Sequence, residues 1–219
     1  MSLPPERYQS ERASDAATQW ETPDSSFDGN LSEFAQALIG SRQNISSKRL
    51  LDPGPSAMQI EQLLSAAAAA PDHGLLTPWR FVIVPPDKRA LLGEAFALAL
   101  TERDANAAPD QIRSAREKAQ RAPFLMLAIV RLEADNSGIP EMERIVSLGC
   151  ALQNILLAAH AMGFGAGLTG GQAMSSTHIR RLFTLIEGEQ AVCYVNVGTV
   201  GKRKAQRAPP ASWVFTSTL

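Results

Sequence analysis

Cysteine is scarce in this sequence, and neither sign of charge is in excess. The 219 residues include two cysteines, Cys150 and Cys193, which lie far apart and have no second cysteine or histidine at the spacing of metal ligands. This pattern argues against a disulfide framework and a zinc site, and it is typical of a reducing compartment. With 21 basic and 22 acidic side chains, the net charge of -1 provides no field that attracts nucleic acid or an anionic membrane. We therefore expect a cytoplasmic protein with no metal site and no nucleic-acid partner.

Long apolar runs are also absent. The longest ones, residues 124–130 and 66–71, are far shorter than the roughly 20 residues that cross a bilayer. Charged side chains occur throughout the first residues, where a secretory signal would need a continuous apolar stretch. We expect neither a membrane span nor a secretory signal.

The sequence has no motif for catalysis by its own side chains. It contains no nucleophile elbow, no Ser-His-Asp order, no paired-carboxylate motif and no H-E-x-x-H motif, and His160 and His178 have no partner motif. An enzyme with such a sequence would depend on a cofactor.

What the sequence does contain is enough apolar surface for one core, since 45% of its residues are hydrophobic. Residues 1–30 are acidic and poor in large apolar side chains. They are predicted to form an N-terminal extension, either flexible or docked through Trp20 and Phe27. Residues 31–219 are predicted to form a single domain with a basic C-terminal segment.

Hydrophobic periodicity predicts several helices. A capping box of Ser56 and Gln59 begins one that runs into the alanines of residues 66–70 and ends at Pro71. Others are expected at residues 31–40, 88–103 and 109–121 and after Pro140. The helix at 31–40 has an apolar face that we expect to be buried: Leu31, Phe34, Ala35, Leu38 and Ile39. The helix after Pro140 is expected to turn inward Ile145, Leu148, Leu152, Ile155, Leu156 and Ala159.

Three short apolar segments are predicted to be strands: residues 81–84, 124–130 and 191–197. The first is expected to be central. The helix at 109–121 is basic, which is usual for a solvated face but also fits a cover over a site that attracts anions.

Residues Gly165–Gly170 match G-x-G-x-x-G, but they follow a helix, whereas a dinucleotide-binding turn follows a strand. One alternative is a helix C-cap at Gly163 followed by a flexible or close-packed strand. Another is that the glycines let a flat ligand lie on the backbone. Two basic segments, at Ser41–Arg42 and after Gly198, border core elements in the way that protein loops grip a phosphate without a P-loop.

These segments resemble the flavin-dependent nitroreductase family, in particular its compact branch of NAD(P)H nitroreductases, from about Leu31 to Pro210. The most specific piece, Ala70–Phe81, is similar to the A-P-D-H-x-x-x-x-P-W-[RH]-F signature of that branch. Ser41-Arg42-Gln43 stands at the R-R-S flavin-phosphate motif, residues 163–171 at a Gly-Phe-Gly loop, and Gly198–Thr199 at a Gly-Thr-Pro. The chain departs from these motifs at the residues that follow Arg42, at Leu168 and at Val200.

The resemblance implies an α+β fold with a central, mostly antiparallel sheet flanked by helices, in an intertwined homodimer. It also implies FMN sites at the subunit interface, NADH or NADPH as electron donor, and a nitroaromatic, quinone or related electrophile as acceptor. Arg42, with Lys202, Arg203 or Arg207, would neutralise the phosphate; Gln43, Asn44 and Ser46 would contact phosphate, ribityl or pyrimidine edges. Gly167, Leu168, Thr169 and Gly170 would lie beneath the ring, and His73 and Leu76 would reach the flavin of the partner subunit. No residue is expected to be a covalent catalyst.

Two other interpretations stay open. The changes at Gln43, Asn44 and Leu168 also fit a flavin-binding or flavin-free relative with little or no turnover. A Rossmann dehydrogenase is disfavoured by the helix that precedes the glycines.

Overall fold

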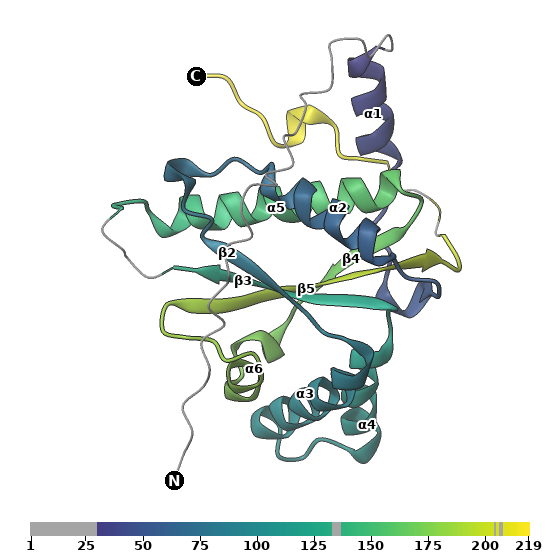
Figure 1. Cartoon of the computed structure of the whole chain (residues 1–219), viewed down its shortest axis with the longest axis vertical. Coiled ribbons are helices and arrows are strands. Elements are labelled where there is room, and N and C mark those ends of the chain that lie inside the picture. The colour runs from purple at the N-terminus through teal and green to yellow at the C-terminus, as the bar shows by residue number, and fades with distance from the viewer. Residues whose placement is uncertain (1–29, 133–136, 204, 206–207) are drawn as a thin grey trace, which may run out of the picture. The chain divides into compact units, whose positions relative to one another are not determined.

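The computed structural model describes residues 30–132, 137–203, 205 and 208–219 (Figure 1). The chain divides into two compact units, Met1–Ala37 and Leu38–Leu219. The division falls within helix α1 (Leu31–Ser41), later than the extension that we predicted to end at residue 30. The predicted docking of Trp20 and Phe27 concerns residues outside the described part of the chain.

The second unit is built on a five-stranded sheet. Its strands are β1 (Leu50–Leu51), β2 (Trp79–Ile83), β3 (Phe124–Arg131), β4 (Gly165–Thr169) and β5 (Glu189–Val200). The order is β1-β5-β3-β2, and β4 also pairs with β5; each of these pairs is antiparallel. A single parallel bridge joins Asn44 to Ala166. The predicted α+β class with a mostly antiparallel sheet is confirmed.

Helices cover both faces of this sheet (Figure 1). Successive side chains of β3 alternate between two cores, because residues in a strand point to opposite faces. Met126 packs with α2 (Ala57–Ala68) and α5 (Glu141–Ala161), whereas Leu127 packs with α3 (Arg89–Arg103) and α6 (Thr177–Leu182). Helix α4 (Pro109–Glu117) packs against α3. The predicted capping box of Ser56 and Gln59 is present at the start of α2.

Strand β2 does not occupy the central position that we expected. It pairs with β3 alone and forms the edge of the sheet as described. Its sequence is nevertheless apolar because both of its faces are partly covered: Phe81 packs against one core and Val82 against the other. An apolar run therefore indicates covered faces and does not reveal a strand's neighbours.

Helix α5 crosses the sheet and buries most of the residues that periodicity placed on its inner side, including Leu148 and Ile155. Ile145 is the exception, at 44% exposed, and its neighbours Met142 and Val146 are more exposed still. Among the described helices, α5 alone is long and apolar enough to cross a membrane by composition, and 44% of that apolar window is buried inside the fold.

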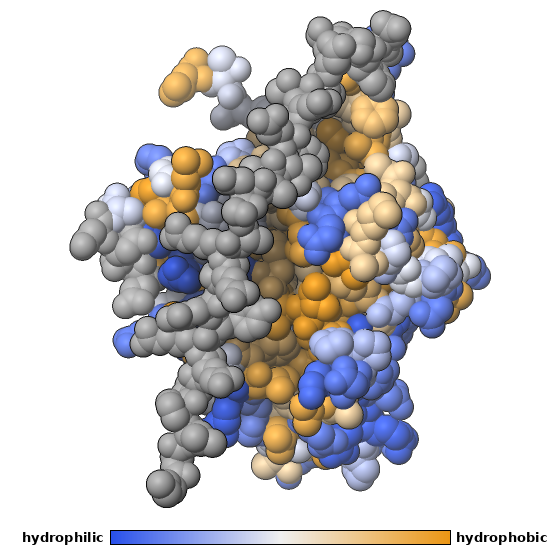
Figure 2. Space-filling view, in the orientation of Figure 1, coloured by the Kyte–Doolittle hydropathy of each residue, from blue (hydrophilic) through white to orange (hydrophobic). Residues whose placement is uncertain are grey.

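Several large apolar side chains remain uncovered within this single chain. No residue of α1 is buried, so the prediction that this helix buries an apolar face is wrong for the single chain. Figure 2 shows apolar residues gathered in the middle of the viewed face. The described residues at least half exposed include Leu31, Phe34, Ile39, Met58, Met142, Val146, Trp213 and Phe215. Exposed apolar surface of this kind marks contact sites.

Candidate functional site

The glycine segment begins as a helix C-cap. Gly163 has a φ of 86° and donates its N–H to the carbonyl of His160, and Phe164 donates to the carbonyl of Ala159. Such left-handed caps are typical ends of helices. The chain then continues directly into β4, so these glycines form a helix-turn-strand and not the strand-turn-helix of a dinucleotide fold.

Close packing explains the next glycines. A Cβ at Gly167 would stand 2.3 Å from the carbonyl oxygen of Ile45, and Ile45 donates its N–H to the carbonyl of Ala166 at 2.9 Å. The segment after Arg42 therefore lies against β4 where only a glycine permits it. Of the two alternatives left open above, the close-packed strand holds at Gly167, because the protein's own backbone occupies the space above it.

A narrow recess lies where this segment meets the end of α5. It is lined by Arg42, Gln43, His160 and Arg203, together with the start of β4, and no carboxylate contributes to its described lining. Its volume of about 10 Å³ is close to the minimum for one water molecule, so a larger anion would bind at its mouth. Neither Arg42 nor Arg203 forms an ion pair with any described residue.

His160 shows how positive this recess is. Burial lowers the pKa of His160, and the charges of Arg203 and Arg42 lower it further. The imidazole is therefore neutral near pH 7, and its Nε2 lies 2.8 Å from the Ser41 hydroxyl. The buried Oε1 of Gln43 has no hydrogen-bond partner among the described atoms. Uncompensated guanidinium groups with an unused amide oxygen fit an anion that also carries hydroxyl groups, such as a sugar phosphate.

The other predicted residues of this site differ in their surroundings. Asn44, Ser46 and Lys202 are exposed and are not part of the recess lining, and Arg207 lies outside the described residues. Leu168 is partly buried, and its side chain packs against the core shared with α5. Thr169 and Gly170 are exposed at the far end of β4, about 13 Å from Gly165 for a strand of this length.

Asn196 holds that far end in place, although no sequence motif pointed to this residue. This residue is 2% exposed, and its Nδ2 donates to the hydroxyl of Thr169 at 2.9 Å and to the carbonyl of Gly167 at 3.2 Å. The available signal was an amide between two valines in an otherwise apolar strand. His160 and Glu143 were likewise given no role from sequence.

The loop before β2 presents a second polar pair. His73 Nδ1 lies 2.6 Å from Glu143 Oε2, and the Asp72 carboxylate accepts the N–H of Thr77 at 2.6 Å. Leu75 and Thr77 have positive φ angles of 54° and 43°, which non-glycine residues rarely adopt. The strained turn exposes Leu75 fully, at 88%, whereas the predicted contact residue Leu76 is half-buried. Strain of this kind concentrates at ligand and contact sites.

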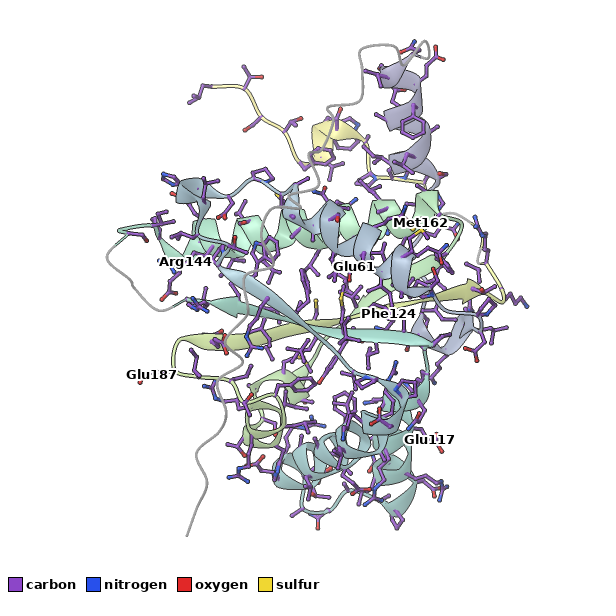
Figure 3. All side chains as sticks on the ribbon, viewed as in Figure 1. Glu61, Glu117, Phe124, Arg144, Met162 and Glu187 are labelled. Atoms are coloured by element: carbon purple, nitrogen blue, oxygen red, sulfur yellow. The ribbon has the colours of Figure 1, made fainter. Side chains whose placement is uncertain are left out.

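The two polar groups lie at opposite ends of α5. Glu143 is in its first turn and His160 in its last, which places them about 26 Å apart along a helix that rises 1.5 Å per residue. Arg144 and Met162, labelled in Figure 3, mark these ends. Within one chain, the structure therefore brings Arg42, Gln43 and Arg203 together and keeps His73 far from them.

Comparison with known proteins identifies the family. The nitroreductase family profile matches residues 42–199. A Haemophilus influenzae protein named "Putative NAD(P)H nitroreductase" is 32% identical over 173 residues, which cover 79% of this chain and 91% of that protein. The Escherichia coli K12 protein "Putative NAD(P)H nitroreductase YdjA" is 32% identical over 157 residues, covering 70% and 82%.

Solved structures show the same fold. A nitroreductase-like family protein from Bacillus cereus superposes with a TM-score of 0.73 at 18% identity, over 84% of this chain and 94% of that one. An FMN-dependent nitroreductase from Clostridium difficile R20291 gives 0.60 at 16% identity, over 83% and 97%. Since the profile spans most of the chain and the sequence relatives share about a third of their residues with it, this chain belongs to the nitroreductase family, and it is a flavin oxidoreductase.

Proposed function

We propose that the chain is an FMN-dependent NAD(P)H oxidoreductase that passes hydride, in two half-reactions, to a nitroaromatic, a quinone or a related electrophile. The observation that carries this proposal is the group of uncompensated cations at the start of β4. FMN has one phosphate, a hydroxylated chain and a flat ring, and the described residues offer a partner for each. When bound, FMN would supply the hydride-transfer chemistry.

Each partner follows from a contact already described. Arg42 and Arg203 would bind the phosphate at the mouth of the recess, and the unused amide oxygen of Gln43 would accept a hydrogen bond from a ribityl hydroxyl. The backbone at Thr169–Gly170 would meet the ring, at a distance fixed by the length of β4. N–H groups held in place by Asn196 would stabilise the negative charge that develops there on reduction.

We further propose that a second copy of the chain completes each site. Glu143, which His73 contacts, is about 26 Å along α5 from His160 of the recess, so His73 would reach a flavin bound there from a partner subunit. The exposed apolar side chains of α5, Met142 and Val146, lie on the same helix and would be covered in such a pair. A two-fold dimer would then contain two equivalent sites.

The direct test is a flavin titration. The apoprotein mixed with FMN should bind about one flavin per chain, quench its fluorescence, and lose the oxidised absorption bands when NADPH or NADH is added anaerobically. Binding without reduction by either donor would favour a flavin-binding relative with little turnover. Failure to bind FMN would contradict the proposal.

Mixed dimers test the shared site. A heterodimer of one Arg42→Ala chain and one His73→Ala chain, purified with two tags, would have one intact site and one doubly altered site. It should bind half the flavin with wild-type affinity and turn over at half the wild-type rate per dimer. If each chain held its own complete site, both sites would be defective and no wild-type fraction would appear. A heterodimer of Arg42→Ala and Lys88→Gln chains is the matched control, because Lys88 is exposed and remote from the motifs.

A further inference from the structure

A second cavity adjoins Thr169 and Gly170, the residues proposed above to meet the flavin ring. It has a volume of about 840 Å³ and lies between α3, α4 and the residues that follow β4. Thr169 and Gly170 form part of its wall, and Leu125, Tyr194 and Asn196 of the sheet also line it. Phe96 and Leu100 of α3 add apolar surface. A chamber of this size is ample for a drug-sized aromatic molecule.

Tyr194, one of the residues that line this chamber, carries an unused hydrogen-bond donor. The residue is 2% exposed, and its hydroxyl has no partner among the described atoms. Phe96 and Phe183 fix its ring, with centroids 5.5 and 6.1 Å away. Burial raises the pKa of Tyr194, so the hydroxyl keeps its proton. A buried hydroxyl without a partner is unfavourable, and a ligand oxygen would satisfy it.

The chamber also has a surplus of positive charge. Arg103, Lys118 and Arg121 line it, whereas Asp110 is the one carboxylate of its described lining and is already paired with Arg113. Arg103 and Lys118 form no ion pair with the described residues, and Arg121 reaches only Ser114, at 3.5 Å. The basic face of α4 and of the turn that follows it therefore covers a cavity and does not merely face solvent.

We propose that this chamber receives the electron acceptor and selects flat aromatic acceptors that carry a carboxylate or sulfonate. The apolar walls would hold the ring, and the Tyr194 hydroxyl would donate to a nitro or quinone oxygen. Arg103, Lys118 and Arg121 would bind the acidic group. This inference rests on the proposed function, because the chamber can serve the acceptor only if the flavin ring lies at Thr169–Gly170. The phosphates of the nicotinamide donor present similar anionic chemistry, so the test treats the two half-reactions separately.

The test compares 4-nitrobenzoate with 4-nitrobenzyl alcohol, two acceptors of similar shape that differ in charge. In the holoenzyme, the ratio of their kcat/KM values should favour the anion, and the double variant Arg103→Gln/Lys118→Gln should lower that ratio about 10-fold. The Lys88→Gln variant, which removes a cation outside the chamber, should leave the ratio unchanged. Calorimetric titration of the oxidised holoenzyme with 4-nitrobenzoate, with no NAD(P)H present, should show a matching loss of affinity without any turnover.

Tyr194→Phe separates binding from structure. It should weaken 4-nitrobenzoate binding about 5-fold while the Tm stays the same or rises, because the lost hydroxyl has no partner in the protein. An unchanged selectivity ratio in the double variant would overturn the proposal. The proposal would also fail if the double variant slowed flavin reduction by NAD(P)H and left reoxidation by the acceptor unchanged, because the cations would then bind the donor. If neither donor reduces the flavin, the proposed function itself fails, and this appears before any acceptor is added.

Discussion

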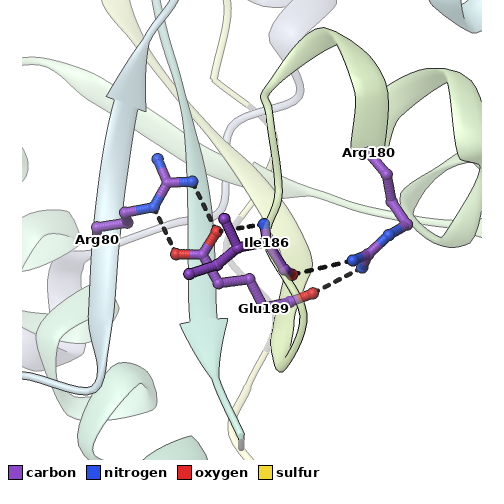
Figure 4. Close-up of polar contacts among 4 residues, drawn as sticks. All are labelled: Arg80, Arg180, Ile186 and Glu189. Carbon is purple, nitrogen blue, oxygen red and sulfur yellow. Dashed lines mark hydrogen bonds and ion pairs between the residues drawn. The ribbon is translucent and has the colours of Figure 1, made fainter. Parts of the chain in front are cut away.

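Two groups of arginine side chains in this chain have opposite surroundings. Arg80 donates through Nε and Nη2 to the Glu189 carboxylate, at 2.8 Å each, and Arg180 donates to the carbonyls of Glu189 and Ile186 (Figure 4). Arg42 and Arg203 have no such carboxylate and lie beside a neutral histidine. The first group uses its charges to join β2, β5 and the loop after α6, whereas the second leaves its charges available for a ligand.

Arginine content alone does not distinguish the two groups. Arg80 lies inside the family signature, yet its partner Glu189 is 3% exposed, and the hydrogen bond from Arg80 lowers the pKa of that carboxylate. Removal of either partner from such a pair is costly because it leaves the other uncompensated. The paired group should therefore affect stability and the unpaired group should affect binding, and each of the following predictions tests one side of this difference.

The largest effect is expected for Arg80→Met, which leaves the Glu189 carboxylate buried without its cation. The free energy of unfolding should fall by about 2–3 kcal/mol, as measured by urea denaturation of the apoprotein. Arg116→Met is the matched control, because its partner Glu94 is exposed and such pairs contribute about 0–1 kcal/mol. Equal losses in the two variants would show that burial of Glu189 is not what makes the first pair important.

Arg42→Met should show the reverse. The affinity for FMN should fall about 10- to 100-fold, which corresponds to the loss of charge-assisted hydrogen bonds, while the unfolding free energy of the apoprotein changes little. Fluorescence titration with FMN measures the first quantity and urea denaturation the second. If the Arg42→Met apoprotein lost as much unfolding free energy as the Arg80→Met apoprotein, the contrast between the two groups would be wrong.

The smallest effect concerns pH. Because the pKa of His160 is lowered in the apoprotein, protonation favours the unfolded chain, and stability should fall as the pH drops through about 6.5. A bound phosphate would favour the protonated imidazole instead, so FMN binding should take up a proton in this range. When the pH is lowered from 7.5 to 5.5, the affinity for FMN should therefore fall a few-fold less in the wild type than in His160→Gln. Parallel pH profiles would contradict a role for His160 beside the phosphate.

Periodicity and capping signals predicted most of the elements around the site. The capping box of Ser56 and Gln59, the C-cap at Gly163 and the buried strand at 124–130 all appear as expected, because each depends on interactions between residues close in sequence. The edge position of β2 and the two-residue strand β1 were not predictable in this way. They depend on pairing with β3 and β5, which lie far along the chain.

Only those residues of the candidate site that belong to a recognisable sequence motif could be predicted. Arg42 and Arg203 were found because basic segments border core elements, and the structure places them together. His160, Asn196 and Glu143 were not found, since each acts through a partner more than twenty positions away. The chamber beneath α4 was anticipated only as one reading of a basic helix, because its depth depends on the packing of α3 and α4 over the sheet.

The close approach of Ile45 to Gly167 has a kinetic consequence. The loop that carries Arg42 is already fastened to β4 by a main-chain hydrogen bond, so it need not reorganise when a cofactor arrives. Association with FMN should then be limited by diffusion and steering, with a rate constant that falls steeply as ionic strength rises. A larger residue at Gly167 would force this loop away from the strand, and the rate would then depend on how often the loop returned to its bound conformation.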